Sequence, residues 1–350
     1  MGKKKMNTQA NFILSKSKLL QQYNAINKLV NKVSYSFKTN PIAGNILEQE
    51  TDCLFSVHSI QLLKQIKDKS RVLFFAQGWD YEEIHSLINQ KINTFVVDNK
   101  TDLNLLLNYI KEHKKIITLY LRMKLKENTI HTGKHFVFGL SSKDVNEIIQ
   151  EQNNNKNIKE INIHFHRKTQ NISEWELKEE LEQSLEEHTL QNINTINLGG
   201  GLPITYNNSK AETEYIFKKI NELNEWLQQY QINTIAEPGR FIAGPAVELK
   251  VNIKNIYDHN IIIDASIFNA AMDTFIAHVR LQVKEEVTKR EGKPFTIKGS
   301  TPDSVDIFRY RVFLKDPKVG DTLTFLNAGA YTFKTDFCGL QEIQTKIKKE

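Results

Sequence analysis

From residue 33 to residue 236, short β-rich runs alternate with longer helical stretches. The eight runs are Val33–Phe37, Cys53–Val57, Arg71–Ala76, Thr94–Val97, Ile116–Arg122, Glu160–Phe165, Thr195–Leu198 and Thr234–Ala236. The helical stretches lie near Ile42–Gln49, Ser59–Lys67, Tyr81–Asn89, Asp102–His113, Lys143–Gln150, Ser173–His188 and Ala211–Tyr230. Strands that alternate with helices form a parallel sheet. Eight such units favour an α/β fold closed into a (βα)8 TIM barrel, with a doubly wound open sheet as the alternative.

The pattern changes at Lys250, after which β-rich runs follow one another without long helices. These runs are Val251–Tyr257, Ile261–Asp264, Val279–Lys284, Phe295–Lys298, Tyr310–Leu314 and Thr322–Leu326. Turn signals rich in glycine and proline separate them, as at residues 291–294. We therefore expect a mainly antiparallel β domain. The expected division is a barrel at residues 31–250, with residues 1–30 and 251–350 in the β domain.

Composition excludes several classes of protein. The formal net charge is +6, and its main concentrations are lysines near the two ends of the chain, which predict solvated tails and no nucleic-acid partner. Cys53 and Cys338 are the only cysteines in the sequence, too few for a disulfide framework or a cysteine zinc cluster. No apolar run approaches the length of a membrane span. We expect a cytoplasmic protein without a membrane partner.

Polar residues follow the expected barrel strands at the points where the strands end. They are Lys38, the segment Ser56–His58, Arg122, His166, the turn Gly199–Gly201 and the segment Glu237–Arg240. In a barrel of this type, the carboxyl ends of all eight strands open on one mouth, where active sites lie. The sequence therefore predicts that these groups converge on one site.

Lys38 follows an apolar-rich run at the end of the first expected strand. A lysine held among apolar neighbours loses hydration of its ammonium group, so its pKa falls. The free amine is then available to form a Schiff base with a carbonyl. The alternative is an ordinary surface lysine.

Several further groups suit a phosphorylated aldehyde cofactor with a basic ring nitrogen. Gly199, Gly200 and Gly201 allow the backbone to approach an anion closely and to present N–H groups to it. Arg240 could pair with a phosphate, and Glu237 could bond a protonated pyridine nitrogen. The alternative for this last pair is a structural salt bridge at a turn.

His164-Phe165-His166 places two histidines on one face of a strand, which suggests a metal site. No carboxylate or cysteine lies nearby at the spacing that zinc sites use, so we expect no metal. The alternative interpretation makes His164 a hydrogen-bonded core histidine. His166 would lie nearer the mouth, where its ring can stack on a flat ligand.

Five motifs in a fixed order resemble the fold-type III pyridoxal-phosphate decarboxylases. This group includes the ornithine, arginine and diaminopimelate decarboxylases, and its barrel is related to that of alanine racemase. The resemblance covers residues 33–339, most of the chain. The motifs are Ser36–Asn40, Phe165–Thr169, Leu198–Pro203, Glu237–Arg240 and Asn327–Tyr331.

The resemblance implies pyridoxal 5'-phosphate as the cofactor and assigns roles to individual residues. Lys38 would bind the cofactor covalently, His166 would stack on its ring, and Glu237 would bond the ring nitrogen. The phosphate would be held by Thr169, Gly199, Gly200, Gly201, Arg240 and Tyr331.

The segment Thr301–Asp306 resembles a family strip that enters the active site of the partner subunit. The resemblance therefore implies a homodimer with shared active sites. Asp303 would hold the distal amine of the substrate, and Asp306 and Arg122 are further candidate substrate contacts. Such a strip favours a basic amino acid of the ornithine, lysine or arginine type, with CO2 and a di- or polyamine as products. Diaminopimelate or an N-acylated ornithine of the siderophore type is the alternative substrate.

The chain departs from the family pattern at the position of the proton donor and at a position that contacts the lysine. Pro302 stands where the family has the cysteine that returns a proton to the substrate carbon. Cys338 is the first candidate to replace this donor, and Ser300 is another. Ser56 occupies the position where the ornithine branch commonly has an aspartate that contacts the lysine. These changes leave a second alternative open, a catalytically impaired regulatory homologue.

Overall fold

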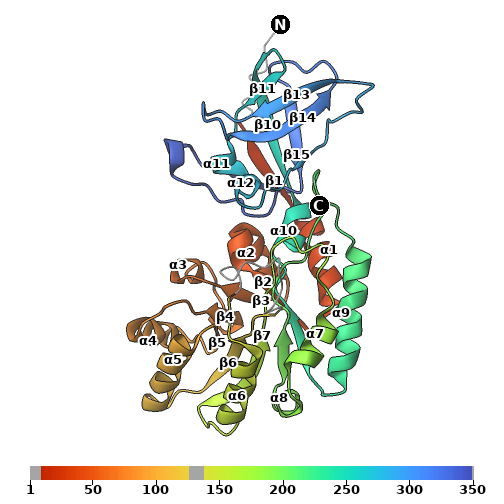
Figure 1. The fold of residues 1–350 in the computed structure, drawn as a ribbon. Helices are drawn as coiled ribbons and strands as arrows, with labels where there is room; N and C mark the ends of the chain where they lie inside the picture. The colour runs from red at the N-terminus through yellow and green to blue at the C-terminus, as the bar shows by residue number, and fades with distance from the viewer. Residues whose placement is uncertain (1–8, 126–137, 349–350) are drawn as a thin grey trace. The chain divides into compact units, whose positions relative to one another are not determined.

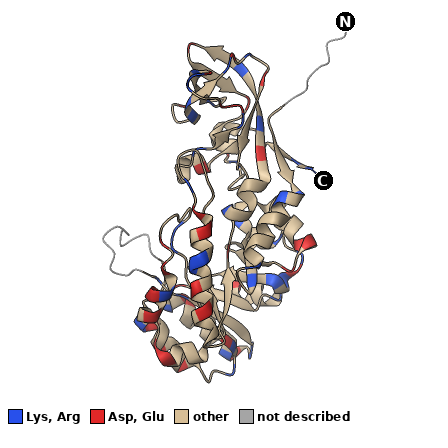
Figure 2. Ribbon diagram, turned by 90° about the vertical axis from the view of Figure 1, so that its right-hand side faces the viewer, with Lys and Arg blue, Asp and Glu red and all other residues tan. Residues whose placement is uncertain are grey.

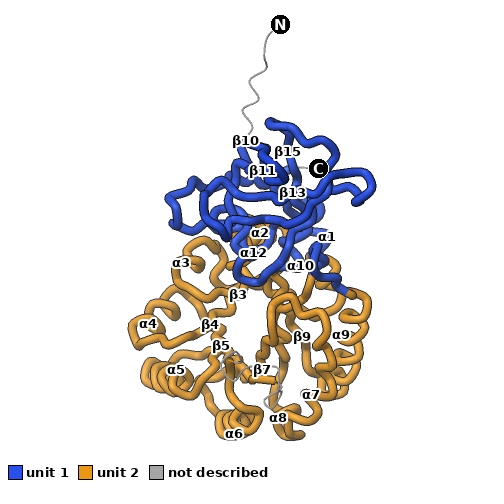
Figure 3. The backbone as a smooth tube through the Cα atoms, turned by 45° about the horizontal axis from the view of Figure 1, so that its top comes forward, with its two compact units in different colours: residues 1–22, 204–211, 240–350 blue, residues 23–203, 212–239 orange. Residues whose placement is uncertain are grey.

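The structure is a computed structural model that describes residues 9–125 and 138–348. The chain forms two compact units, which are coloured separately in Figure 3. Unit 1 comprises residues 1–22, 204–211 and 240–350, and unit 2 comprises residues 23–203 and 212–239. The expected boundaries placed residues 204–211 in the barrel, whereas these residues group with the sheet of unit 1.

Unit 2 is a closed barrel of eight parallel strands, which Figure 3 shows as a ring; Figure 1 labels its strands β2 to β7. The strands are β2 (Lys32–Ser36), β3 (Leu54–Val57), β4 (Val72–Phe75), β5 (Thr94–Val97), β6 (Ile117–Arg122), β7 (Ile158–His164), β8 (Thr195–Asn197) and β9 (Asn233–Ala236). This closed barrel confirms the expected (βα)8 fold, and each strand begins and ends within about two residues of its expected bounds.

Helices follow the strands in chain order. They are α2 (Pro41–Glu50), α3 (Ile60–Leu63), α4 (Tyr81–Asn89), α5 (Lys100–Glu112), α6 (Ser142–Gln152), α7 (Leu177–Ser184), α8 (Glu187–Asn192) and α9 (Thr213–Gln228). Capping residues fix where several of them begin. The side chains of Asn40, Asp80, Asn99 and Ser141 each accept a hydrogen bond from the first turn of the helix that follows. The caps hold the loops at the carboxyl ends of the strands, where the site lies.

One helix expected over residues 173–188 is instead two helices, α7 and α8, separated by extended residues. The side chain of Asn146 explains the break. Its amide nitrogen donates to the carbonyl of Ser184 at 3.0 Å, and its oxygen accepts from the backbone N–H of Glu186 at 3.2 Å. These bonds satisfy backbone groups that a continuous helix would have used.

Unit 1 contains an eight-stranded, mostly antiparallel sheet. Its strands are β1 (Asn11–Ser15), β10 (Val247–Tyr257), β11 (Asn260–Ile263), β12 (Gln282–Val283), β13 (Lys293–Lys298), β14 (Ile307–Leu314), β15 (Thr322–Leu326) and β16 (Gln344–Lys348). The main path runs β12-β15-β10-β11-β13-β14, with β1 between β10 and β16. The antiparallel β domain is thereby confirmed, although β1 and β16 were not expected.

Three short helices and one longer helix complete the regular structure around this sheet. They are α10 (Arg240–Ala246), α11 (Ile267–Ala270), α12 (Asp273–Ile276) and α1 (Lys16–Asn27), which runs from unit 1 into unit 2. Among the described residues, no helix is both long and apolar enough to cross a membrane. Acidic and basic positions are interspersed along the helices of unit 2 in Figure 2.

Candidate active site

Glu237 lies directly after β9 and is only 6 % exposed. Its carboxylate accepts three hydrogen bonds from three other barrel strands. Oε1 accepts from Ser56 Oγ at 2.7 Å and from Asn197 Nδ2 at 2.9 Å, and Oε2 lies 3.2 Å from His164 Nε2. We call Glu237, Ser56, Asn197 and His164 the carboxylate network.

The register of the parallel strands brings the network together. His164 pairs with Asn197 across β7 and β8, and Asn197 pairs with Ile235 across β8 and β9. Because parallel strands end at the same edge of a barrel, these residues reach the same level as Glu237. The network therefore lies at the mouth where the polar strand ends were expected to converge.

The network keeps Glu237 ionised. Burial alone would raise the pKa of this carboxyl group, but the hydrogen bonds from His164, Ser56 and Asn197 outweigh it and hold the pKa below its usual range. A buried carboxylate with this many donors holds its negative charge across the physiological pH range. Such a carboxylate is suited to accept a hydrogen bond from a protonated group of a ligand.

Lys38 lies in a single 3-10 turn, Phe37–Thr39, that follows β2. Its side chain remains exposed, yet the surrounding protein removes part of its hydration. This burial lowers the pKa of Lys38, the negative charge of Glu237 opposes the change, and the positive charge of Arg122 reinforces it. The amine is therefore more available as a nucleophile than that of an ordinary lysine.

His166 follows β7 and is oriented by the glycine turn. The backbone N–H of Gly200 donates to His166 Nδ1 at 3.1 Å, which leaves the proton of a neutral ring on Nε2. Burial lowers the pKa of His166 to about 3, and the positive charge of Arg122 lowers it further. The ring is consequently neutral and fixed in direction, as a stacking surface requires.

The glycine turn requires residues without side chains. Gly199 has a φ of +64°, and a Cβ there would lie 2.1 Å from the carbonyl oxygen of Phe165. Gly201 has a φ of +101°, and a Cβ there would lie 2.5 Å from the carbonyl oxygen of Lys168. A turn of this shape allows an anion to approach the backbone closely, although the N–H groups of Gly199 and Gly200 already donate to Asn197 Oδ1 and His166 Nδ1.

Arg122 ends β6 and pairs with His164 in the strand register. Its guanidinium lies 5.6 Å from the ring centroid of Phe138, and its Nε is buried without a hydrogen bond to any described residue. Burial lowers its pKa, whereas the charges of Asp98 and Glu237 raise it. Arg122 thus supplies a cation that is electrostatically coupled to the network.

Three residues near the mouth have contacts that the sequence did not predict. Ser56 was expected near the lysine but donates to Glu237, and its hydroxyl also bonds Ser34 Oγ at 2.8 Å. Asn197 had no expected role. His58 stacks on Phe75 with ring centroids 4.6 Å apart, and burial followed by the charge of Lys38 lowers its pKa to about 3. In the sequence, only the position of these three residues at or near strand ends indicated that they could lie at the site.

Arg240 lies in unit 1 and is already balanced by a carboxylate. Its guanidinium forms a two-pronged ion pair with Asp273, in which Nη2 lies 3.0 Å from Oδ1. It also donates to the hydroxyl of Tyr206 at 2.7 Å and lies 5.2 Å from the ring centroid of Tyr331. Burial opposes its charge, but the bond to Asp273 outweighs this and raises its pKa. The sequence predicted that Arg240 could pair with a phosphate, but it did not predict that Asp273 already pairs with this arginine.

The remaining expected site residues differ in exposure. Asp306 is fully buried, and its carboxylate accepts from the N–H of Ile267 and from both the N–H and the hydroxyl of Thr301. Asp306 therefore has backbone and hydroxyl donors within unit 1, and its expected contact with substrate stays a prediction. Asp303 is half-buried, with Oδ1 accepting from the N–H of Val305 at 3.0 Å. Cys338 is exposed in unit 1, and Thr169 is exposed after β7.

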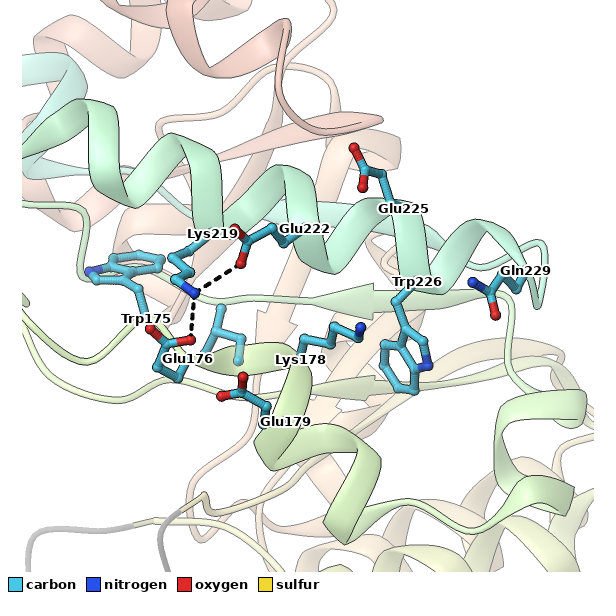
Figure 4. Close-up of a pocket in the computed structure, with 10 residues that line it drawn as sticks. Trp175, Glu176, Lys178, Glu179, Lys219, Glu222, Glu225, Trp226 and Gln229 are labelled. Carbon is cyan, nitrogen blue, oxygen red and sulfur yellow. Dashed lines mark hydrogen bonds and ion pairs between the residues drawn. The ribbon is translucent and has the colours of Figure 1, made fainter.

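A separate groove lies on the outside of unit 2 between α7 and α9, with a volume of about 270 Å3 (Figure 4). Lys219 forms ion pairs there with Glu176 at 2.7 Å and Glu222 at 2.9 Å. Trp175 and Trp226 line the groove but are themselves buried. We interpret it as a seam between two packed helices, since none of the strand-end groups lines it.

Two families match consecutive parts of the chain. The pyridoxal-binding domain of the pyridoxal-dependent decarboxylases matches residues 18–244, and the C-terminal sheet domain of these enzymes matches residues 242–329. The chain is 20 % identical over 332 residues to a probable ornithine decarboxylase of Dictyostelium discoideum, covering 86 % of this chain and 70 % of that protein. It is 23 % identical over 290 residues to the diaminopimelate decarboxylase of Bacillus subtilis, covering 75 % of this chain and 66 % of that protein.

Solved structures share the fold at low sequence identity. The diaminopimelate decarboxylase of Helicobacter pylori complexed with L-lysine has a TM-score of 0.84 at 18 % identity, covering 98 % of this chain and 92 % of that one. The lysine/ornithine decarboxylase of Vibrio vulnificus complexed with cadaverine has a TM-score of 0.79 at 22 % identity, covering 99 % and 96 %. With the family match extending over most of its length, the chain belongs to the pyridoxal-dependent decarboxylases.

Proposed function

We propose that this protein uses pyridoxal 5'-phosphate to decarboxylate a basic amino acid of the ornithine, lysine or arginine type. The observation that carries the proposal is the buried, ionised carboxylate of Glu237 at the same barrel mouth as the low-pKa amine of Lys38. The products would be CO2 and a di- or polyamine, which places the reaction in polyamine formation.

The residues of unit 2 fit this cofactor. Glu237 offers a carboxylate to a protonated ring nitrogen, Lys38 offers an amine to an aldehyde, and the turn from Gly199 to Gly201 offers open backbone to a phosphate. When bound, pyridoxal phosphate supplies an aldehyde carbon that reacts with amines and a ring that accepts the electrons left as a carboxylate departs as CO2.

The chain's own groups would then divide the work. Lys38 would hold the cofactor covalently, and burial, which lowers its pKa, would favour the free amine that this bond needs. Glu237 would offer its carboxylate to the protonated ring nitrogen, and the neutral ring of His166 would offer a flat face to the cofactor. Thr169, Arg240 and Tyr331 are proposed as further phosphate contacts. Because Asp273 already neutralises Arg240, we expect this arginine to orient the phosphate more than to attract it.

The substrate assignment is supported by Asp303 and by the activities that the names of the relatives state. Asp303 is a half-buried carboxylate suited to a distal amine, and Arg122 offers a cation to a carboxylate. The relatives act, by name, on ornithine, lysine or diaminopimelate. Diaminopimelate or an N-acylated ornithine is the alternative substrate. Cys338 remains our candidate for the proton donor that Pro302 cannot supply.

We further propose that the protein works as a cytoplasmic homodimer with shared active sites. Both cysteines are free, as in a reducing compartment. Unit 1 exposes a set of large apolar side chains suited to an interface, namely Phe275, Ile276, Val305, Phe333 and Phe337. Val305 belongs to the same strip as Asp303.

A panel of amino acids scored for both CO2 and amine product tests the activity. Ornithine, lysine and arginine should give the largest kcat/KM in cofactor-loaded protein, and omission of the cofactor is the control. Turnover of diaminopimelate or N-acetylornithine alone would establish the alternative substrate. A loaded protein that releases no CO2 from any member of the panel would support the regulatory homologue.

Mixing two inactive variants tests the shared site. Lys38→Ala chains and Asp303→Ala chains should each lack activity. An equimolar mixture should recover up to about a quarter of the wild-type rate after exchange, since half of its dimers are heterodimers and one of the two sites in each receives both native residues. Rates are measured after subunit exchange is verified by mass. Absence of recovery would mean that one chain builds the whole site, or that Asp303 is not part of it.

A further inference from the structure

His164 is a buried histidine whose two ring nitrogens have different surroundings. It is 1 % exposed, and Nε2 lies 3.2 Å from Glu237 Oε2. Nδ1 is buried and has no hydrogen bond to any described residue. The edge-to-face contact with Phe75, with centroids 5.1 Å apart and planes at 79°, fixes the ring on its other side. The ring is therefore held so that Nε2 faces the carboxylate.

The surroundings decide where the proton of His164 lies. Burial lowers its pKa, and the negative charge of Glu237 only partly opposes this. A charged ring would also bury an N–H at Nδ1 without an acceptor, which is costly. The favoured form is consequently a neutral ring with its proton on Nε2, which donates to Glu237.

The hydrogen bonds from described residues leave Glu237 one vacant acceptor position. A carboxylate has about four such positions, two on each oxygen. Ser56 and Asn197 occupy both positions on Oε1, and His164 occupies one on Oε2. The remaining position on Oε2 is the one that a protonated ring nitrogen can use.

We propose that His164 is a positioning residue that holds Glu237 ionised and directs its single free acceptor position towards the ring nitrogen of the cofactor. This inference rests on the proposed function and deepens it, because it names the group that keeps Glu237 ionised and fixes the direction of its free acceptor position. Ser56 and Asn197 donate hydrogen bonds to Oε1. Among the described residues, His164 is the one whose side chain bonds Oε2, the oxygen proposed to receive the ligand.

Other charged or titratable groups also face Glu237, and their charges contribute to its pKa together with His164. They are Lys38 after β2, His58 after β3, Arg122 on β6 and His166 after β7. None of these four residues donates a hydrogen bond to the carboxylate, unlike His164. A change at His164 should therefore alter the acidity of Glu237 more than a change at any of these.

The decisive variants are His164→Leu, which removes the donor, and His164→Gln, which replaces it with an amide N–H. Loss of a hydrogen bond to a charged group should raise the pKa of Glu237 by about one unit or more. Enzyme loaded with cofactor labelled with 15N in its ring reports the protonation of that nitrogen directly. In His164→Leu the 15N shift should move towards the unprotonated form, and the acid limb of kcat/KM should move to higher pH. His164→Gln should restore both readouts substantially.

Asn162→Leu is the matched control for disruption of the barrel interior. Asn162 lies two residues earlier on β7, is fully buried, and accepts from the N–H groups of Asn194 and Thr195 without contacting Glu237. This variant should lose stability but keep the wild-type 15N shift. If His164→Leu does not fold, Phe75→Leu provides a second test, because loss of the ring contact should produce a partial shift in the same direction.

Two outcomes overturn the inference. One is a folded, cofactor-loaded His164→Leu protein with the wild-type 15N shift and pH profile. The other, in the event that His164→Leu does not fold, is a loaded Phe75→Leu protein with both wild-type readouts. Wild-type protein that binds no pyridoxal phosphate would instead contradict the proposed function itself, so the two failures are distinguishable.

Discussion

Replacing Lys38 with alanine is expected to abolish covalent retention of pyridoxal phosphate and to reduce decarboxylation on the order of a thousandfold or more. The reason is that Lys38 is the lysine whose charge is coupled to Glu237, His58 and His166 at the barrel mouth. Borohydride reduction of the loaded protein, followed by peptide mass mapping, should locate the cofactor on the peptide that contains Lys38.

Lys32→Ala is the matched control for this experiment. Lys32 begins the same strand, β2, at the end opposite the mouth, and its ammonium pairs with Asp52. This variant should retain the cofactor and most of the activity, since an exposed ion pair contributes little to stability. A reduced cofactor adduct that persists in Lys38→Ala would assign the covalent bond to another lysine.

Replacing Glu237 with glutamine is expected to leave cofactor binding nearly intact while slowing turnover about a hundredfold or more, comparable to removing other pre-organised electrostatic groups. The amide oxygen can keep the bonds from Ser56 and Asn197. The amide nitrogen then takes the place of Oε2, where a neutral His164 can accept only by shifting its proton to Nδ1, which has no acceptor among the described residues. The variant should fold with some loss of stability, but it presents a donor where the ring nitrogen needs an acceptor.

Cofactor titration followed by turnover at saturation separates binding from catalysis in this variant. Glu160→Gln serves as the control, because Glu160 lies near the opposite end of β7. Its turnover should match the wild type. An equal loss of cofactor affinity and turnover in Glu237→Gln would contradict the role assigned to this carboxylate.

The barrel was predictable because local sequence carries its signals. Strand β4 (Val72–Phe75) is buried at every position, as a strand covered on both faces should be, and such apolar runs between helices can be read directly. The break between α7 and α8 was not predictable. It depends on the side chain of Asn146, 38 residues before Ser184, and no local pattern signals that contact.

The candidate site was predictable as a set of residues but not as a set of contacts. Lys38, His166 and Glu237 stand at strand ends, and the motif order identified them. The donors to Glu237 come from three separate strands, so they depend on strand register, which periodicity alone does not specify. Asp273 lies 33 residues from Arg240, and its pairing with that arginine depends on the fold of unit 1.

The division of the chain into two units also bears on how such a protein can evolve. The groups proposed to tune the cofactor, Glu237 with Ser56, Asn197 and His164, all belong to unit 2, whereas Asp303 belongs to unit 1. On the proposed role of Asp303, the residues that select the substrate and the residues that tune the cofactor belong to different units of the chain. We therefore propose the strip around Asp303 as the first target for directed evolution of substrate specificity.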